Sequence, residues 1–303
     1  MAIVLIATQN GCRAFTDAGE GELELAGRNI CAMAPEAGGA CLAVVDGNEI
    51  WRRTASGAWS QVRTISDSLV AILSLDGKIF AATGEPALVR IPASGEVKRL
   101  NGFDTIEGRN EWCDSGPPLH VRALTATADG SAIMAAVHVG GIPRSTDGGE
   151  TWAPTIPVMD DVHEVRAHSS MANIVAAATT YGLCLSQDGG CNWTTFGEGL
   201  EVNHGLAVAV LNDEVLFSVQ HDPFAERSQI WRWKLGATGI EQVREGLPQW
   251  LDGKVDTLHI AAGNDQAAVV DRGGSLWLSK QGSLGWQRIA TDVQDAYGGM
   301  VVL

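Results

Sequence analysis

The chain is short of positive charge. Its 303 residues carry 21 Lys and Arg against 36 Asp and Glu, a formal net charge of −15 at pH 7. A nucleic-acid partner is excluded, because binding one needs a basic surface that displaces counterions from phosphates. Only five of the cations are lysines, so an anionic membrane surface is excluded as well. We expect a small molecule as the ligand.

Long apolar runs and closely paired cysteines are also missing. The apolar start, Met1 to Ala7, has no basic segment and runs into polar Thr8 to Asn10, so we expect a strand rather than a signal peptide or membrane span. The six cysteines include no Cys-x-x-Cys pair. We therefore expect reduced thiols in a cytoplasmic protein. The alternative is that Cys184 and Cys191 meet across a hairpin.

Glycine and tryptophan, in contrast, are plentiful. The chain has 36 Gly and 10 Trp, which is typical of many short strands joined by tight turns over large core side chains. Two segments, Ser145 to Trp152 and Ser186 to Trp193, share the pattern S-x-D-x-G-x-x-W and lie 41 residues apart. In such a hairpin the Asp carboxylate accepts backbone N–H bonds, the Gly takes positive φ and the Trp packs beneath the turn.

This pattern is the Asp-box, or BNR repeat, and the chain resembles the sialidase-like and photosystem-assembly-factor-like β-propellers that carry it. The resemblance implies an all-β propeller with these hairpins on its rim, away from the central channel. Weaker versions of the hairpin end near residues 23, 59, 97, 241 and 286. The seven tips recur every 36 to 55 residues, close to the length of a four-stranded blade.

We therefore predict a single seven-bladed β-propeller domain over residues 1–303. The chain begins with the pattern of a second strand at Ala2 to Ala7 and finishes with that of an inner strand at Met300 to Leu303. The C-terminal strand should join the N-terminal blade and close the ring, which removes an exposed sheet edge.

Histidines recur at one position of consecutive blades. His120 and His204 each lie nine residues before the acidic residue of the following turn, Asp129 or Asp213, and His163 falls near the same position in the blade between them. This position is the start of the inner strand, and we call the face where inner strands begin the channel face. Converging imidazoles there are a ligand set for a divalent metal ion, with Zn, Mn, Fe, Ni and Cu not distinguished. The alternative is that each histidine only hydrogen-bonds in a polar channel mouth.

Other residues complete the predicted site. The proton-transfer candidates are acids expected on the same face: Glu111, Asp256 and Asp67. The substrate-binding candidates are Trp112, Arg122, Arg166, His138, His221, His259 and Trp250. Trp112 belongs to an insertion, Asn101 to Pro118, that forms either a lid on the channel face or a tolerated surface loop. The Gly-Gly pairs precede no helix, so we expect no nucleotide cofactor.

The sequence thus predicts a small-molecule hydrolase or lyase whose metal ion polarises a substrate oxygen or lowers the pKa of bound water. Sialidase chemistry is not expected, because it needs an arginine triad and a Tyr nucleophile supported by Glu, and only Tyr181 and Tyr297 are present. The Asp-box xyloglucanases work in a long cleft between two propeller domains, and one ring is too short for that. The competing class is a non-catalytic propeller that binds a ligand or a protein on the same face. The oligomeric state is not predicted.

Overall fold

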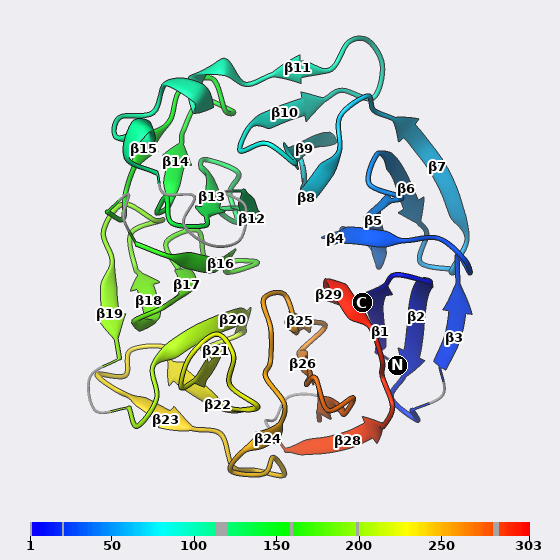
Figure 1. Cartoon of the computed structure of the whole chain (residues 1–303), viewed down its shortest axis with the longest axis vertical. Helices are drawn as coiled ribbons and strands as arrows, with labels where there is room; N and C mark the ends of the chain where they lie inside the picture. The colour runs from blue at the N-terminus through cyan, green and yellow to red at the C-terminus, as the bar shows by residue number, and fades with distance from the viewer. Residues whose placement is uncertain (1, 20, 113–119, 158–159, 198–199, 281–284) are drawn as a thin grey trace.

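The computed structural model describes residues 2–19, 21–112, 120–157, 160–197, 200–280 and 285–303 (Figure 1). Seven antiparallel sheets stand around a central axis, and each runs from an inner strand at the axis to an outer strand at the rim (Figure 1). The prediction of an all-β, seven-bladed propeller is confirmed.

We number the blades in chain order and give their strands from axis to rim. Blade 1 contains β29 (Ala296–Val302), β1 (Ile3–Thr8), β2 (Gly11–Thr16) and β3 (Gly21–Glu24). Blade 2 contains β4 (Ile30–Glu36), β5 (Ala40–Val45), β6 (Glu49–Arg53) and β7 (Trp59–Thr64). Blade 3 contains β8 (Leu69–Leu75), β9 (Lys78–Thr83), β10 (Leu88–Ile91) and β11 (Lys98–Arg99).

Two short 3-10 helices, η1 (Asn101–Thr105) and η2 (Arg109–Glu111), lie in the insertion that follows. Blade 4 contains β12 (Val121–Ala126), β13 (Ile133–Val137), β14 (Pro143–Ser145) and β15 (Ala153–Pro154). Blade 5 contains β16 (Val162–Ala167), β17 (Val175–Thr179), β18 (Gly182–Ser186) and β19 (Thr194–Phe196).

Blade 6 contains β20 (His204–Leu211), β21 (Glu214–Gln220), β22 (Arg227–Lys234) and β23 (Ile240–Gln242), and β24 (Leu251–Asp252) pairs with β22 as a fifth strand. Blade 7 contains β25 (Ile260–Gly263), β26 (Gln266–Val270), β27 (Leu276–Ser279) and β28 (Trp286–Ala290). The second strands are buried along almost their whole length, as in β13 and β17, because neighbouring blades cover both of their faces.

The ring is closed between the two ends of the chain. β29 pairs antiparallel with β1, and Val302 lies opposite Val4, Val301 opposite Leu5 and Met300 opposite Ile6. The two termini consequently lie in the same blade (Figure 1). The predicted closure by the C-terminal strand agrees with this pairing.

Most inner strands carry a β-bulge just after their first paired residue. In β12, Val121 pairs with Val137 and Ala123 with Ala136, so Arg122 is the extra residue. In β16, Val162 pairs with Thr179 and Glu164 with Ala178, and the extra residue is His163. The pairing of β4, β8 and β20 shifts at the same point. A bulge breaks the alternation of side chains and re-aims the extra one, so it decides what the channel face presents.

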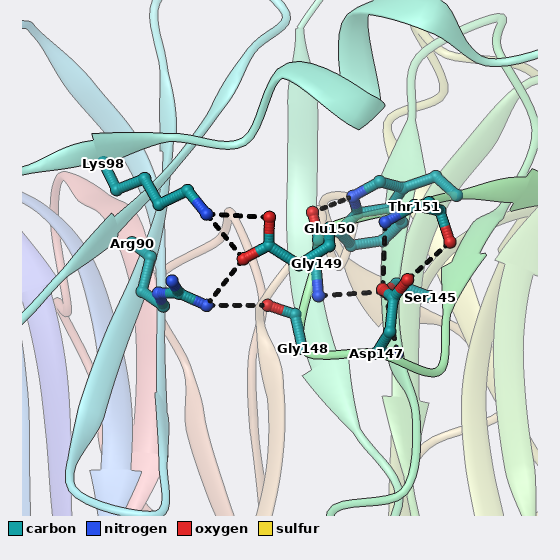
Figure 2. Close-up of polar contacts among 9 residues, drawn as sticks. Arg90, Lys98, Ser145, Asp147, Gly148, Gly149, Glu150 and Thr151 are labelled. Atoms are coloured by element: carbon teal, nitrogen blue, oxygen red, sulfur yellow. Dashed lines mark hydrogen bonds and ion pairs between the residues drawn. The ribbon is translucent and has the colours of Figure 1, made fainter.

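The S-x-D-x-G-x-x-W hairpins form closed hydrogen-bond networks on the rim (Figure 2). The Oγ of Ser145 accepts a bond from the N–H of Gly149 at 2.9 Å and donates to Asp147 at 2.8 Å. Asp147 also accepts from the N–H and the hydroxyl of Thr151, at 2.9 and 2.6 Å. The second copy repeats this network around Ser186.

Each of these hairpins is also held by the blade before it. Arg90 in β10 donates to the carbonyl oxygen of Gly148 at 3.4 Å, and Arg90 and Lys98 both pair with Glu150 (Figure 2). Arg144 in β14 likewise donates to the carbonyl oxygen of Gly189 at 2.9 Å. The hairpins therefore join adjacent blades at the rim.

The two hairpin tryptophans differ in burial. Trp152 is buried, and its ring meets that of Phe103 edge-on at 5.2 Å. Trp193 is only half-buried, and its indole N–H donates to the Thr155 hydroxyl at 3.2 Å. The expectation that both rings pack fully beneath their turns is therefore met by Trp152 and not by Trp193.

Within the described ranges all five cysteines, Cys184 and Cys191 among them, are free. Across the same ranges no helix has the length and apolar character needed to cross a membrane.

Candidate functional site

The pairing register identifies which residues share the position just before the inner strands. Val121, Val162 and Gly205 are the last paired residues before the register shift in the inner strands of blades 4, 5 and 6, and are therefore equivalent. The residues directly before them are His120, Asp161 and His204.

The register therefore places Asp161 where the sequence alignment placed His163. The turn after β16 is one residue longer than the turn after β12, which accounts for one of the two residues that separate His163 from Asp161. His163 lies in the bulge, at the position equivalent to Arg122. Sequence reasoning missed Asp161, although the Val that follows both His120 and Asp161 was a signal that could have found it.

Five side chains on this face form what we call the histidine–aspartate cluster: His120, His138, Asp161, His163 and His204. The Asp161 carboxylate lies 3.3 Å from Nε2 of His163 and 3.7 Å from Nε2 of His138. The rings of His163 and His204 are 5.0 Å apart, and those of His120 and His138 are 6.1 Å apart. Asp161 thus links the two histidine pairs.

Main-chain and carboxylate contacts fix the His163 ring. Its Nδ1 lies 2.6 Å from the carbonyl oxygen of Gly205, which can only accept. Nδ1 therefore carries a proton. Nε2 faces the Asp161 carboxylate, so the ring is held between a main-chain carbonyl on one side and a carboxylate on the other.

Three buried atoms of the cluster have no hydrogen-bond partner in the described part of the chain. They are Nδ1 of His138, Oδ1 of Asp161 and Nε2 of His204. Buried polar atoms in folded proteins are nearly always bonded to protein or to water. Three such atoms in one cluster are consequently the strongest sign of a ligand site in the molecule.

The charge states of the cluster follow from burial and from its own charges. Burial, with the charge of Arg122, lowers the pKa of His138 to about 4. Burial, with the charge of His163, lowers the pKa of His204 to about 4. Burial opposes ionisation of Asp161, but the hydrogen bond from His163 and the neighbouring charges outweigh it and lower the pKa of Asp161 to about 2. At neutral pH, His138 and His204 are therefore neutral and Asp161 is charged.

A buried carboxylate closes the inner side of the cluster. Glu164 is fully buried and accepts bonds from the N–H groups of Leu258 at 2.9 Å and Val208 at 3.2 Å, and from Nε of Arg166 at 2.7 Å. Beyond it lies a cavity of about 790 Å³ lined by the far ends of the inner strands, with Arg166 and His168 among its walls. Arg166, a substrate-binding candidate, therefore lines this cavity and is paired with Glu164.

Several predicted residues lie on the same face beside the cluster. His259 is buried, its Nδ1 has no hydrogen-bond partner among the described residues, and burial lowers its pKa to about 4. Asp256 is bonded by Lys254 at 3.0 Å and Arg272 at 2.9 Å.

His221 and Trp250 form a stacked pair in blade 6. Their ring centres are 5.9 Å apart and the ring planes differ by 9°. The guanidinium of Arg227 lies 4.7 Å from the Trp250 ring. The loop after β21 and the segment before β24 thus bring these two predicted residues together as a pair of their own.

The structure does not bring the remaining predicted residues into the cluster. Trp112 is buried in the core beside Phe103, at 5.6 Å. Glu111 is exposed at a shallow surface hollow that also includes residues 154–157. Asp67 is exposed in front of β8. Residues 113–118 of the insertion lie outside the described residues, so its role as a lid stays a prediction.

The donor atoms of the cluster are of the types that bind transition metals, namely carboxylate oxygen and imidazole nitrogen. Within the described ranges, however, no three His, Cys, Asp or Glu side chains are placed to hold a metal ion together. His163 and His204 are in ring contact while His120 lies beside His138. The predicted trio of His120, His163 and His204 is therefore not gathered around one point.

No protein-family model matches the sequence, and no curated protein matches it. Solved structures do share the fold. An ancestral GH74 enzyme has 15% identity and a TM-score of 0.63 over 86% of this chain and 38% of its own. The GH74 xyloglucanase of Xanthomonas campestris has 14% identity and a TM-score of 0.59 over 95% and 46%. The computationally designed Ika8 protein has 10% identity and a TM-score of 0.58 over 98% and 85%.

The chain thus spans less than half the length of either GH74 enzyme. At these identities the likeness concerns the fold. What the comparisons establish is a seven-bladed β-propeller that has GH74 propeller enzymes among its structural neighbours.

Proposed function

We propose that this chain is a small-molecule enzyme, a hydrolase or a lyase, that works at the histidine–aspartate cluster. One observation carries the proposal: Nδ1 of His138 is buried without a hydrogen-bond partner in the described residues, while its Nε2 faces the Asp161 carboxylate at 3.7 Å. A carboxylate in that position keeps the proton on Nε2, so that Nδ1 presents an electron pair to a substrate.

In this proposal His138 acts as a general base. Because it is neutral at pH 7, its Nδ1 takes a proton from an attacking water in a hydrolase or from a substrate carbon or hydroxyl in a lyase. The imidazolium that forms is stabilised by the charge of Asp161, and the same proton is then given to the leaving group. His204, whose Nε2 also lacks a partner in the described chain, binds the substrate beside it.

The divalent metal ion expected from the sequence stays part of the proposal. Its supporting observation is the 3.3 Å separation of Asp161 and His163, together with the Gly205 carbonyl that orients the His163 ring. Ligands of a tetrahedral ion bound at about 2.0–2.1 Å lie roughly 3.3–3.4 Å apart, and metal-bound histidines usually donate their other N–H to such a carbonyl. Asp161 and His163 would supply two of the ligands, and the ion would polarise a substrate oxygen.

We further propose that the chain is an Asp-box propeller and is cytoplasmic. The rim hairpins support the first, and the free cysteines of the described ranges support the second. The activity of the GH74 neighbours is not part of the proposal.

The competing function is a non-catalytic propeller that binds a ligand or a protein. The observation in its favour is Phe224, which is 89% exposed in the loop after β21, next to the stacked His221 and Trp250. A large exposed aromatic side chain of this kind is typical of contact surfaces.

The test is a screen of the purified protein against esters, phosphate monoesters and carbon–oxygen lyase substrates. With any substrate found, His138→Gln and Asp161→Asn should each lower turnover by about 100-fold or more, while Asp129→Asn, an acid at the far end of β12, should not. Elemental analysis of the same protein, and of His163→Ala, decides the metal ion. Turnover that survives both cluster variants contradicts the proposal, and absence of turnover with every class favours the binding function.

A further inference from the structure

Arg122 is the extra residue in the bulge of β12, two residues after His120 of the cluster. Its position is equivalent to that of His163 in the next blade. Its charge acts on three members of the cluster, His138, Asp161 and His204. The side chain is half-buried, so part of its hydration is lost.

The two acids that interact electrostatically with Arg122 are already in contact with other side chains. Asp161 and Asp256 are the two carboxylates whose charge it feels. Asp161 is bound by His163 at 3.3 Å, and Asp256 by Lys254 and Arg272. No carboxylate of the described residues lies within ion-pair distance of Arg122.

A half-buried guanidinium that has no carboxylate at ion-pair distance in the described chain is well suited to bind an anion. Its planar fork of N–H groups fits two oxygens of a carboxylate or phosphate at once. Arg122 supplies positive charge to a cluster in which Nδ1 of His138 and Nε2 of His204 have no hydrogen-bond partner in the described chain. A bound oxyanion would therefore meet attraction from Arg122 next to the base that the proposed function assigns.

We propose that Arg122 binds the carboxylate or phosphate group of a small anionic substrate, and so sets the substrate class of this site. The inference rests on the proposed function for its place in a reaction. It stands independently as a statement about oxyanion binding.

The experiment titrates the whole protein with inorganic phosphate and, separately, with acetate, and measures binding by calorimetry. Arg122→Gln should weaken the affinity by about 10- to 100-fold, which is what losing a charge-assisted bidentate pair costs. Arg122→Lys should keep part of the affinity. Arg144→Gln, an arginine of the same blade that bonds a rim hairpin, should bind as the unmodified protein does. The stronger of the two probes identifies the substrate group.

Equal affinity in Arg122→Gln and the unmodified protein would overturn the inference, as would equal losses in Arg122→Gln and Arg144→Gln. Thermal unfolding of each variant confirms that it is folded. His138→Gln separates the two proposals, because it should abolish turnover and keep oxyanion binding. If the protein binds oxyanions through Arg122 but turns over no substrate, the proposed enzymatic function is contradicted and the inference about Arg122 still holds.

Discussion

The rim hairpins and the histidine–aspartate cluster contain similar polar side chains, but the two regions differ in whether those side chains have hydrogen-bond partners. At the rim, Asp147 receives bonds from Ser145 and Thr151. In the cluster, one oxygen of Asp161 and one nitrogen each of His138 and His204 are buried without a hydrogen-bond partner in the described structure. A closed network holds a turn, whereas an open one keeps donors and acceptors available for a ligand.

The two aspartates reach a similar acidity by different routes. Hydrogen bonds from Thr151 lower the pKa of Asp147 to about 2 at an exposed site. Asp161 reaches about 2 against the effect of burial, through His163 and the surrounding positive charge. The same acidity therefore reflects local turn geometry in one case and a charged, partly dehydrated site in the other.

The largest expected difference between the cluster and the rim hairpins is in how strongly acid changes their contribution to the free energy of unfolding. The pKa of His138, His204 and His259 is about 4 in the folded chain, against 6.5 ordinarily. Between these values the unfolded chain binds more protons, so the free energy of unfolding falls as the pH drops from 6.5 to 4. Each histidine contributes up to about 1.4 kcal/mol per pH unit, several kcal/mol in all. Urea titrations at pH 7.5, 6.5, 5.5 and 4.5 measure the slope.

Replacing His138 or His204 by Gln should flatten that slope, and Asp147→Ala should not. The contribution of Asp161 is constant in this window, because it is lost only as the pH falls below 3.8 towards 2. A slope unchanged in both histidine variants would show that these rings are hydrated and that the cluster is not buried.

Because the two hairpin tryptophans differ in burial, replacing each by Ala should lower the free energy of unfolding by different amounts. Trp152→Ala removes a buried ring from the core around Phe103, and should lower the free energy of unfolding by about 3–5 kcal/mol. Trp193 is half-buried, so Trp193→Ala should cost about 1–2 kcal/mol. Chemical denaturation of the two variants measures both values, and equal costs would contradict the difference in packing.

Within one hairpin, Ser145 should contribute more to the free energy of unfolding than Asp147. Ser145 is buried and bonds the N–H of Gly149, so Ser145→Ala leaves a buried donor without a partner and should cost about 1–3 kcal/mol. Asp147 is exposed, and water can replace it, so Asp147→Ala should cost about 0.5–1.5 kcal/mol. Turnover and oxyanion binding per folded molecule should not change in either variant. A loss of either property in Asp147→Ala would place this hairpin in the functional site.

The smallest effect is expected for the exposed ion pair between Lys98 and Glu150 at the junction of blades 3 and 4 (Figure 2). Such pairs are weak and screened by salt. Lys98→Ala should leave the unfolding midpoint in 0.15 M salt unchanged within measurement error. A clear drop in the midpoint would show that the rim contacts between blades are coupled to the rest of the ring.

The fold was predictable because its signals are local. In both rim hairpins the Asp accepts a backbone N–H bond, as the pattern predicts, from Thr151 in one and Asn192 in the other. Ring closure was predicted from the strand patterns at the two ends. Each of these predictions used residues adjacent in sequence, although the closure itself joins the two ends of the chain.

The site was predictable only in part, because it depends on register between blades. His120 and His204 were aligned correctly, but His163 was aligned two residues away from its true position, where Asp161 lies. A bulge turns one side chain away from the alternation expected of a strand, and no local pattern marks it. The burial that leaves Nδ1 of His138 without a hydrogen-bond partner in the described residues likewise depends on tertiary packing.

The joining of β29 to β1 has a consequence for how the molecule assembles. Until Ala296–Val302 is available, blade 1 has three strands and β1 presents an open edge. Blade 1 can therefore be completed only after the chain has been synthesised as far as Val302, through a contact that spans almost the whole chain, and such contacts form slowly. Before then the exposed edge of β1 is a place where another chain can pair. The time needed for β29 to pair with β1 is the time for which this edge stays open.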